Sequence, residues 1–212
     1  MYKNASDWHC WRRVTRFLAR TLPLFLLLSV ISACQSVAPV VKVGLVAPFE
    51  GRHRDVGYDV LYSARLAVRE INAAGGVDGT RVALVALDDS GNPEFARATA
   101  NSLLIDPAVV AVVGHWLPET TETAAPLYTE GNLALFPGGE EPFAAIDPAT
   151  LPPKFIEAYE DVTPFDETPG PYAKPAYDAF QMLFQTFAAA QEVNGQINRQ
   201  SVHAALEEAS DR

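Results

Sequence analysis

Short apolar runs alternate with amphipathic stretches along residues 41–136. The apolar runs are rich in valine and leucine, and they predict buried strands at 41–47, 81–87, 109–113 and 133–136. Between them, apolar residues recur at helical spacing and predict helices at 57–73, 93–105 and 118–131. This alternation indicates βαβ units. We therefore expect an α/β fold, a doubly wound parallel sheet of about four strands with helices on both faces.

Past Gly139 the alternation stops and prolines become frequent. Residues 140–153 contain four prolines and little periodicity, so we interpret them as a Pro-rich linker. A short helix is expected within 154–160, a long one with a wide apolar face at 172–191, and a last one at 199–209. We expect these C-terminal helices, within 154–212, to pack on the lobe formed by 41–139.

The beginning of the chain has the pattern of an export signal. Arginines 12, 13, 16 and 20 precede the apolar run 22–28, and small residues follow, as in a secretory signal peptide spanning 1–33. The run is short and contains Pro23, so a transmembrane helix is the weaker interpretation. Ile31-Ser32-Ala33-Cys34 resembles the bacterial lipobox, which implies an acylated Cys34 and a lipidated tether at 34–40. The alternative is an ordinary signal peptide with a chance cysteine.

Charge and composition argue against several classes of function. The net charge is −10, and since residues 1–33 carry five bases and one acid, the remainder carries −14. Such an acidic body argues against nucleic acid as a partner. The sequence contains no G-x-G-x-x-G, P-loop, H-E-x-x-H or G-x-S-x-G motif, so we expect neither an enzyme nor a cofactor. Its four histidines lack metal-ligand spacing, so no metal is expected.

A series of short motifs carries a family resemblance. The most specific is EINAAGGVDG at 70–79. The other matching segments, in chain order, are 43–48 with Gly51, 64–69, 87–89 with Asn92 and Pro93, 112–115, 155–159, and 171–173 with 176–179. Their order resembles the type I periplasmic solute-binding proteins for branched-chain amino acids. The resemblance covers about 41–139 and 153–209 and implies an exported protein that is lipid-anchored on the extracytoplasmic side of a bacterial membrane. It would bind a small solute, such as an amino acid, for uptake or sensing with an ABC permease.

The family has two lobes that close on the ligand, and the chain resembles only one of them. Residues 140–153 stand where the segment that builds the second lobe would be inserted. The resemblance therefore implies a single lobe made of 41–139 and the later helices. The alternative is a gene fragment.

Candidate ligand-binding residues lie in the loops that follow the strands, because ligands of open α/β sheets bind beyond the carboxyl ends of the strands. The resemblance places a serine in the third loop, where this sequence has Pro118, and Thr120 or Thr121 could substitute for it. Acidic residues near the fourth strand would repel a carboxylate and suit a cationic or neutral ligand. The basic first loop could instead attract a carboxylate. The alternative is that these charges are simply solvated. The candidates are Arg52, His53, Trp116, Thr120, Thr121, Glu140 and Glu141.

A second functional hypothesis is an interaction or scaffold lipoprotein that has lost ligand binding. It would bind another protein chain through an exposed apolar face around Phe49, Trp116 and Phe136. For Trp116 a partly buried structural role is about as favoured as ligand stacking.

Overall fold

The computed structural model describes residues 38–165 and 167–210, and the expected cut site and Cys34 lie outside this part. Four parallel strands form one sheet in the order β2-β1-β3-β4. Their bounds are Val40–Ala47 for β1, Arg81–Asp88 for β2, Val109–Val113 for β3 and Ala134–Phe136 for β4. The expected α/β fold with about four parallel strands is confirmed.

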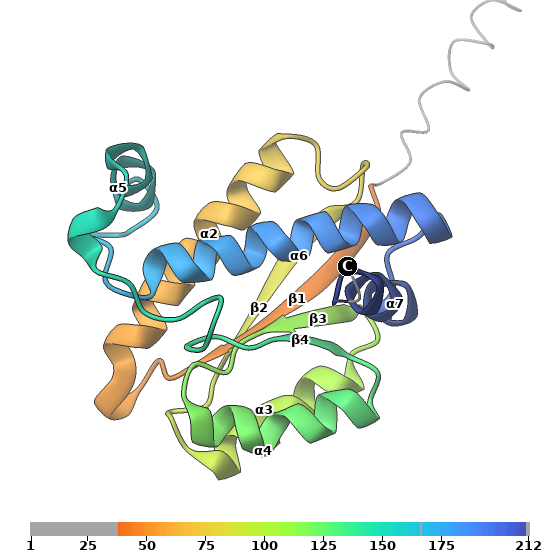
Figure 1. Ribbon diagram of the computed structural model, residues 1–212, viewed down its shortest axis with the longest axis horizontal. Helices are drawn as coiled ribbons and strands as arrows, with labels where there is room; N and C mark the ends of the chain where they lie inside the picture. Colours follow the sequence, from red (N-terminus) through yellow and green to blue (C-terminus); the bar gives the residue numbers. More distant parts are fainter. Residues whose placement is uncertain (1–37, 166, 211–212) are drawn as a thin grey trace, which may run out of the picture. The chain divides into compact units, whose positions relative to one another are not determined.

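Helices cover both faces of the sheet (Figure 1). α3 (Pro93–Ile105) and α4 (Pro118–Glu130) pack together on one face. α2 (Arg54–Ala73), α6 (Ala173–Asn194) and α7 (Arg199–Ser210) pack on the other. The remaining elements are the short helices η1 (Gly51–His53), η2 (Pro148–Thr150) and α5 (Pro153–Glu160).

Alternation along the strands divides the core into two layers. In β1, Val43, Leu45 and Ala47 face α2 and α6, whereas Val46 faces α3 and α4. All four side chains are fully buried, as expected for parallel strands that are covered on both faces. Gly44 lies on the α3 side, where a Cβ would meet Leu103 Cδ1 at 2.8 Å, so the glycine lets α3 approach the sheet.

Helix ends follow the local sequence signals. The side chain of Asn92 accepts a hydrogen bond from Glu94 N, with Pro93 in the first turn, as expected for an N-cap. α6 ends at Gly195, which has the left-handed φ of 69° that favours glycine. α2 starts before the predicted Gly57, because this glycine is inside the helix and contacts Pro48; a Cβ there would meet Pro48 O at 2.3 Å.

The Pro-rich segment 140–153 is packed rather than free. Phe143 is buried in the main core, and Leu151 is buried in a smaller cluster with Phe155 and Tyr159 of α5. The prolines explain the lack of periodicity, but these apolar side chains fix the segment to the lobe.

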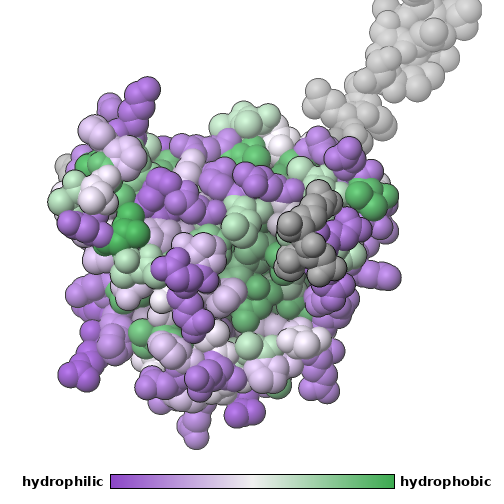
Figure 2. Space-filling model, viewed as in Figure 1, coloured by the Kyte–Doolittle hydropathy of each residue, from purple (hydrophilic) through white to green (hydrophobic). Residues whose placement is uncertain are grey.

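On the side shown in Figure 2 the surface is largely hydrophilic, with a smaller apolar area near the middle of the view.

The last helix is attached at the amino-terminal edge of the sheet. The Arg199 guanidinium donates hydrogen bonds to the carbonyl oxygens of Leu103, Leu104 and Asp106 at the end of α3, and to that of Val109 in β3. A cation at a helix C-terminus also complements the helix dipole. None of the helices formed by the described residues is long and apolar enough to cross a membrane.

Candidate functional site

The four loops at the carboxyl edge of the sheet are joined by hydrogen bonds. Asp89 N donates to Ala47 O over 3.2 Å, which connects the second loop to the end of β1. Gly138 N donates to His115 O over 3.0 Å, which connects the fourth loop to the third. Because backbone bonds connect neighbouring loops, this edge is a preformed surface rather than a set of independent loops.

Asp88 connects the first and second loops through its side chain. Its Oδ1 accepts hydrogen bonds from Phe49 N and Ser90 N, both at 2.8 Å, and its Oδ2 accepts one from Ser90 Oγ at 2.7 Å. Burial raises the pKa of Asp88, but these hydrogen bonds outweigh burial, and the net pKa lies below the usual value. The carboxylate is therefore occupied by protein donors.

A buried polar chain lies beneath the second and third loops. His115 Nδ1 and Asp89 Oδ2 are 2.6 Å apart, and both side chains are fully buried. Asp89 Oδ1 also accepts from Gly91 N over 2.9 Å. On the other side of the imidazole, the Tyr128 hydroxyl is 3.2 Å from Nε2. Burial, followed by the charge of Asp89, raises the pKa of Tyr128, so this hydroxyl stays protonated and can donate to the ring.

The hydrogen-bonded side chains of Asp89, His115 and Tyr128 have a positioning role. The side chains of Asp89 and His115 have no exposed surface, so they cannot contact a ligand in this conformation. They hold the start of the third loop against the second and the body of α4. Asp88 and Asp89 also cap the turn after β2, because their carboxylates accept hydrogen bonds from Ser90 N and Gly91 N.

Trp116 is packed into the core. Its side chain is 1% exposed, its ring lies against Gly138, and it meets the ring of Tyr172 edge-on at 6.0 Å. A Cβ at Gly138 would stand 2.4 Å from the indole, so the indole takes the space that a side chain there would need. Its Nε1 is buried and has no hydrogen-bond partner among residues 38–165 and 167–210.

The prediction of an exposed apolar face around Phe49, Trp116 and Phe136 is therefore wrong. Phe136 is 3% exposed, Trp116 is 1% exposed, and Phe49 is partly buried against the same core. The sequence predicted these residues near a loop surface, but the indole turns inward over Gly138 and joins the layer of α2 and α6.

The other predicted site residues divide by exposure. Arg52 and His53 are exposed on η1, and Glu140 and Glu141 are exposed after β4. Thr120 is fully buried, and its hydroxyl donates to Leu117 O over 2.9 Å.

Thr121 is half-buried in the first turn of α4, and its hydroxyl donates toward the carbonyls of Leu117 and His115 at 3.1 and 3.3 Å. Its acceptor lone pairs remain available to a ligand.

The first three loops meet at Gly91. A Cβ there would lie 2.9 Å from Leu117 Cδ1, 3.5 Å from His53 Cδ2 and 3.9 Å from Pro48 Cβ. The structure therefore brings His53 close to the third loop, but it leaves the basic and acidic candidates without mutual ion pairs among the described residues. No group of three or more potential metal ligands is found within 38–165 and 167–210.

The arrangement is suited to binding. Exposed groups of both charge signs lie at the carboxyl edge of the sheet, where hydrogen bonds hold the loops in place. Such an edge can orient a small polar molecule through several contacts.

Residues 40–153 match the family of periplasmic binding proteins. The chain is 37% identical over 103 residues to an amino acid binding protein of Pseudomonas aeruginosa, covering 48% of this chain and 28% of that protein. It is 33% identical over 108 residues to the leucine-specific-binding protein of Salmonella typhimurium, covering 50% of this chain and 29% of that protein. The chain thus aligns with less than a third of the length of these relatives.

Solved structures show the same fold. A branched-chain amino acid transporter substrate binding protein from Streptococcus pneumoniae, in complex with isoleucine, superposes with a TM-score of 0.63 at 15% identity, over 79% of this chain and 87% of that one. A putative branched-chain amino acid ABC transporter protein from Rhodospirillum rubrum gives a TM-score of 0.64 at 14% identity, over 79% and 88% of the two chains.

The α/β fold agrees with a family match that covers more than half of the chain. The chain belongs to the periplasmic binding protein family.

Proposed function

We propose that the protein binds a small solute of the amino-acid class at the carboxyl edge of its sheet, for ABC-type uptake or sensing. The family match carries this proposal, since residues 40–153 include all four loops at that edge. Two of the relatives are named for binding amino acids. Ligands of open α/β sheets bind at this edge.

The exposed candidates have complementary charges for a zwitterion. Arg52 on η1 can attract a carboxylate, and Glu140 and Glu141 can attract an ammonium group. The Thr121 hydroxyl can add a hydrogen bond from the first turn of α4. One lobe covers only one side of such a ligand, so a second chain closing over it would raise the affinity.

Amino-acid binding can be tested through Trp116. The chain has three tryptophans, and replacing Trp8 and Trp11 by phenylalanine leaves Trp116 alone. Titration of the full-length chain with leucine, isoleucine, valine and lysine should give a saturable change in its emission for at least one of them. Thr121→Val should weaken that binding about fivefold, because one hydrogen bond contributes about 1 kcal/mol.

Thr123→Val is the matched control. Its hydroxyl donates to Glu119 O over 2.8 Å on the same helix, two residues further along. The control should leave the affinity unchanged. Equal weakening by both variants, or no saturable signal with any of the four amino acids up to about 10 mM, would refute binding at this edge.

Lipid anchoring through Cys34 is part of the proposal. The lipobox-like tetrad that ends at this residue supports it, and acylation would hold the lobe at the extracytoplasmic face of the membrane. In a bacterial expression host, Cys34→Ser should move the protein from the membrane fraction to the aqueous fraction. Cys10→Ser, which alters the chain's other cysteine, should leave it with the membranes. Unchanged membrane partition of Cys34→Ser would contradict the anchor.

A further inference from the structure

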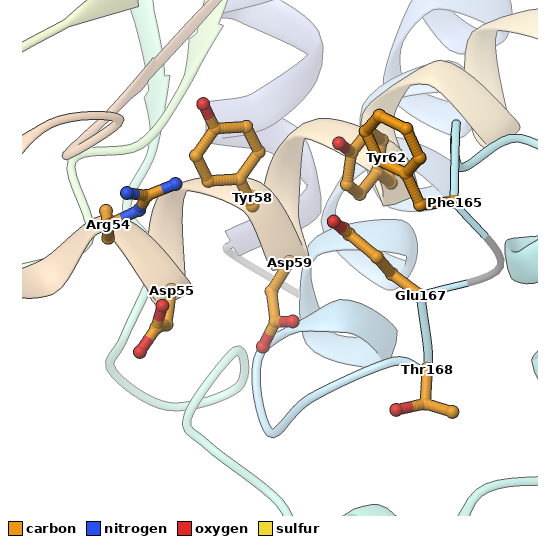
Figure 3. A pocket seen from close by; sticks show the side chains of 8 residues that line it. All are labelled: Arg54, Asp55, Tyr58, Asp59, Tyr62, Phe165, Glu167 and Thr168. Atoms are coloured by element: carbon orange, nitrogen blue, oxygen red, sulfur yellow. The ribbon is translucent and has the colours of Figure 1, made fainter.

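An open cavity of about 610 Å³ lies beside the amino-terminal half of α2 (Figure 3). One wall is the helix, which contributes Tyr58 and Tyr62, and the other is the segment before α6, which contributes Phe165 and Glu167. The volume falls in the range of small-molecule sites. None of the candidate ligand residues at the carboxyl edge lines it.

Aromatic rings line the cavity. The phenyl ring of Phe165 is 81% exposed, an uncommon state for a large apolar side chain. The tyrosine rings already attract cations from the chain itself, since the Arg54 guanidinium lies 5.4 Å from the ring centre of Tyr58 and that of Arg65 lies 5.8 Å from Tyr62. No cation of the described part of the chain is recorded over Phe165, so its ring face is open to a ligand.

Carboxylates dominate the charge of the lining. Asp55, Asp59 and Glu167 contribute three of them, against the single guanidinium of Arg54. Asp59 accepts hydrogen bonds from Gly170 N and Tyr172 N, which fix the second wall to the helix. Burial raises the pKa of Asp59 and outweighs the hydrogen bonds from Tyr172 N and Gly170 N, which lower it. The nearby charges of Asp55 and Glu167 raise this pKa as well, so the three carboxyl groups lie close enough to interact.

The geometry points to a second binding site, for a small organic ammonium ion, between the Tyr58–Tyr62 face of α2 and Phe165 with Glu167. These carboxylates do not converge closely enough to form a metal site within the described residues. A bulkier organic cation instead suits a cavity of this volume, because it can contact ring faces and carboxylates together. Arg54 competes for Tyr58, so Phe165 and Glu167 are the main contributors to affinity.

Choline and its uncharged isostere 3,3-dimethyl-1-butanol provide the test. Isothermal titration of the full-length chain should show saturable choline binding that is at least about tenfold tighter than that of the alcohol, since only choline gains the cation–π and carboxylate attraction. Phe165→Ala should weaken choline binding about threefold to tenfold. Glu167→Gln should weaken it about twofold to fivefold, as for an exposed charge pair.

Two variants at residues that do not line the cavity serve as controls. Phe95→Ala removes a phenyl ring that is 52% exposed on α3, and Glu157→Gln neutralises an exposed carboxylate on α5. Neither should change choline binding. Equal binding of choline and the alcohol, no saturable binding, or equal losses in the controls and the cavity variants would overturn the proposal. Thr121→Val tests the amino-acid site, and Phe165→Ala and Glu167→Gln test the cavity, so the two proposals can fail separately.

Discussion

Asp89→Ala should lower the free energy of unfolding by about 3–5 kcal/mol, measured by urea denaturation. The substitution leaves His115 fully buried without its 2.6 Å partner, and breaking a buried pair from one side costs this much. It also removes the acceptor of Gly91 N. The urea concentration at the midpoint of unfolding should fall, and the slope of the free energy of unfolding against urea concentration should change little.

An exposed ion pair provides the comparison. Lys174 and Asp178 are 2.6 Å apart, one turn of α6 from each other, with side chains 28% and 48% exposed. Asp178→Ala should cost less than about 0.5 kcal/mol. The double variant Asp89→Ala with His115→Ala should lose less stability than the sum of the single losses, because much of each single cost comes from the unpaired partner. Strict additivity, or an Asp89→Ala effect as small as that of Asp178→Ala, would show that the buried pair is not a structural unit.

Gly114→Ala should destabilise the protein by more than about 3 kcal/mol or prevent folding. Gly114 has φ of +125°, and a Cβ there would lie 2.2 Å from Val46 O in β1. Val46 lies in β1 and Gly114 directly follows β3, which pairs with β1, so neither backbone can move without disturbing the ladder. The expected cost adds this steric overlap to a backbone cost of about 1–3 kcal/mol for an L-residue in that region.

Gly75→Ala separates these two contributions. Gly75 also has a positive φ, +105°, but apart from its chain neighbours no atom of the described residues lies within 4 Å of where its Cβ would be. It should therefore show the backbone cost alone, about 1–3 kcal/mol. Thermal unfolding followed by circular dichroism compares the two variants. Equal losses of stability would mean that the backbone around Gly114 adapts to a Cβ.

Most of the helices and strands could be predicted from the sequence because they depend on neighbouring residues. The β3 run at 109–113 and α3 at 93–105 match the structure in both bounds. Asn92 and Pro93 set the start of α3 through local hydrogen bonding and a fixed φ. The sequence also located the four loops at one edge, since all carboxyl ends of a parallel sheet point the same way.

The packing of the site was not predictable in the same way. Trp116 lies in the loop after β3, and whether its indole turns inward depends on Gly138. Residues 140–153 have no periodicity, so the burial of Phe143 and Leu151 could not be foreseen. The cavity beside α2 needs Phe165 and Glu167 to lie against a helix that is about a hundred residues earlier in the chain.

The sequence by itself determined the alternation of strands and helices, the position of the loops, and the charges that those loops carry. Only the tertiary structure decided which of the loop residues reach solvent. Asp89 and His115 are 26 residues apart, and their pairing arises because the strands that precede them, β2 and β3, lie on either side of β1 in the sheet. Local propensity acts over a few residues, whereas burial and side-chain pairing are set by which distant segments the core brings together.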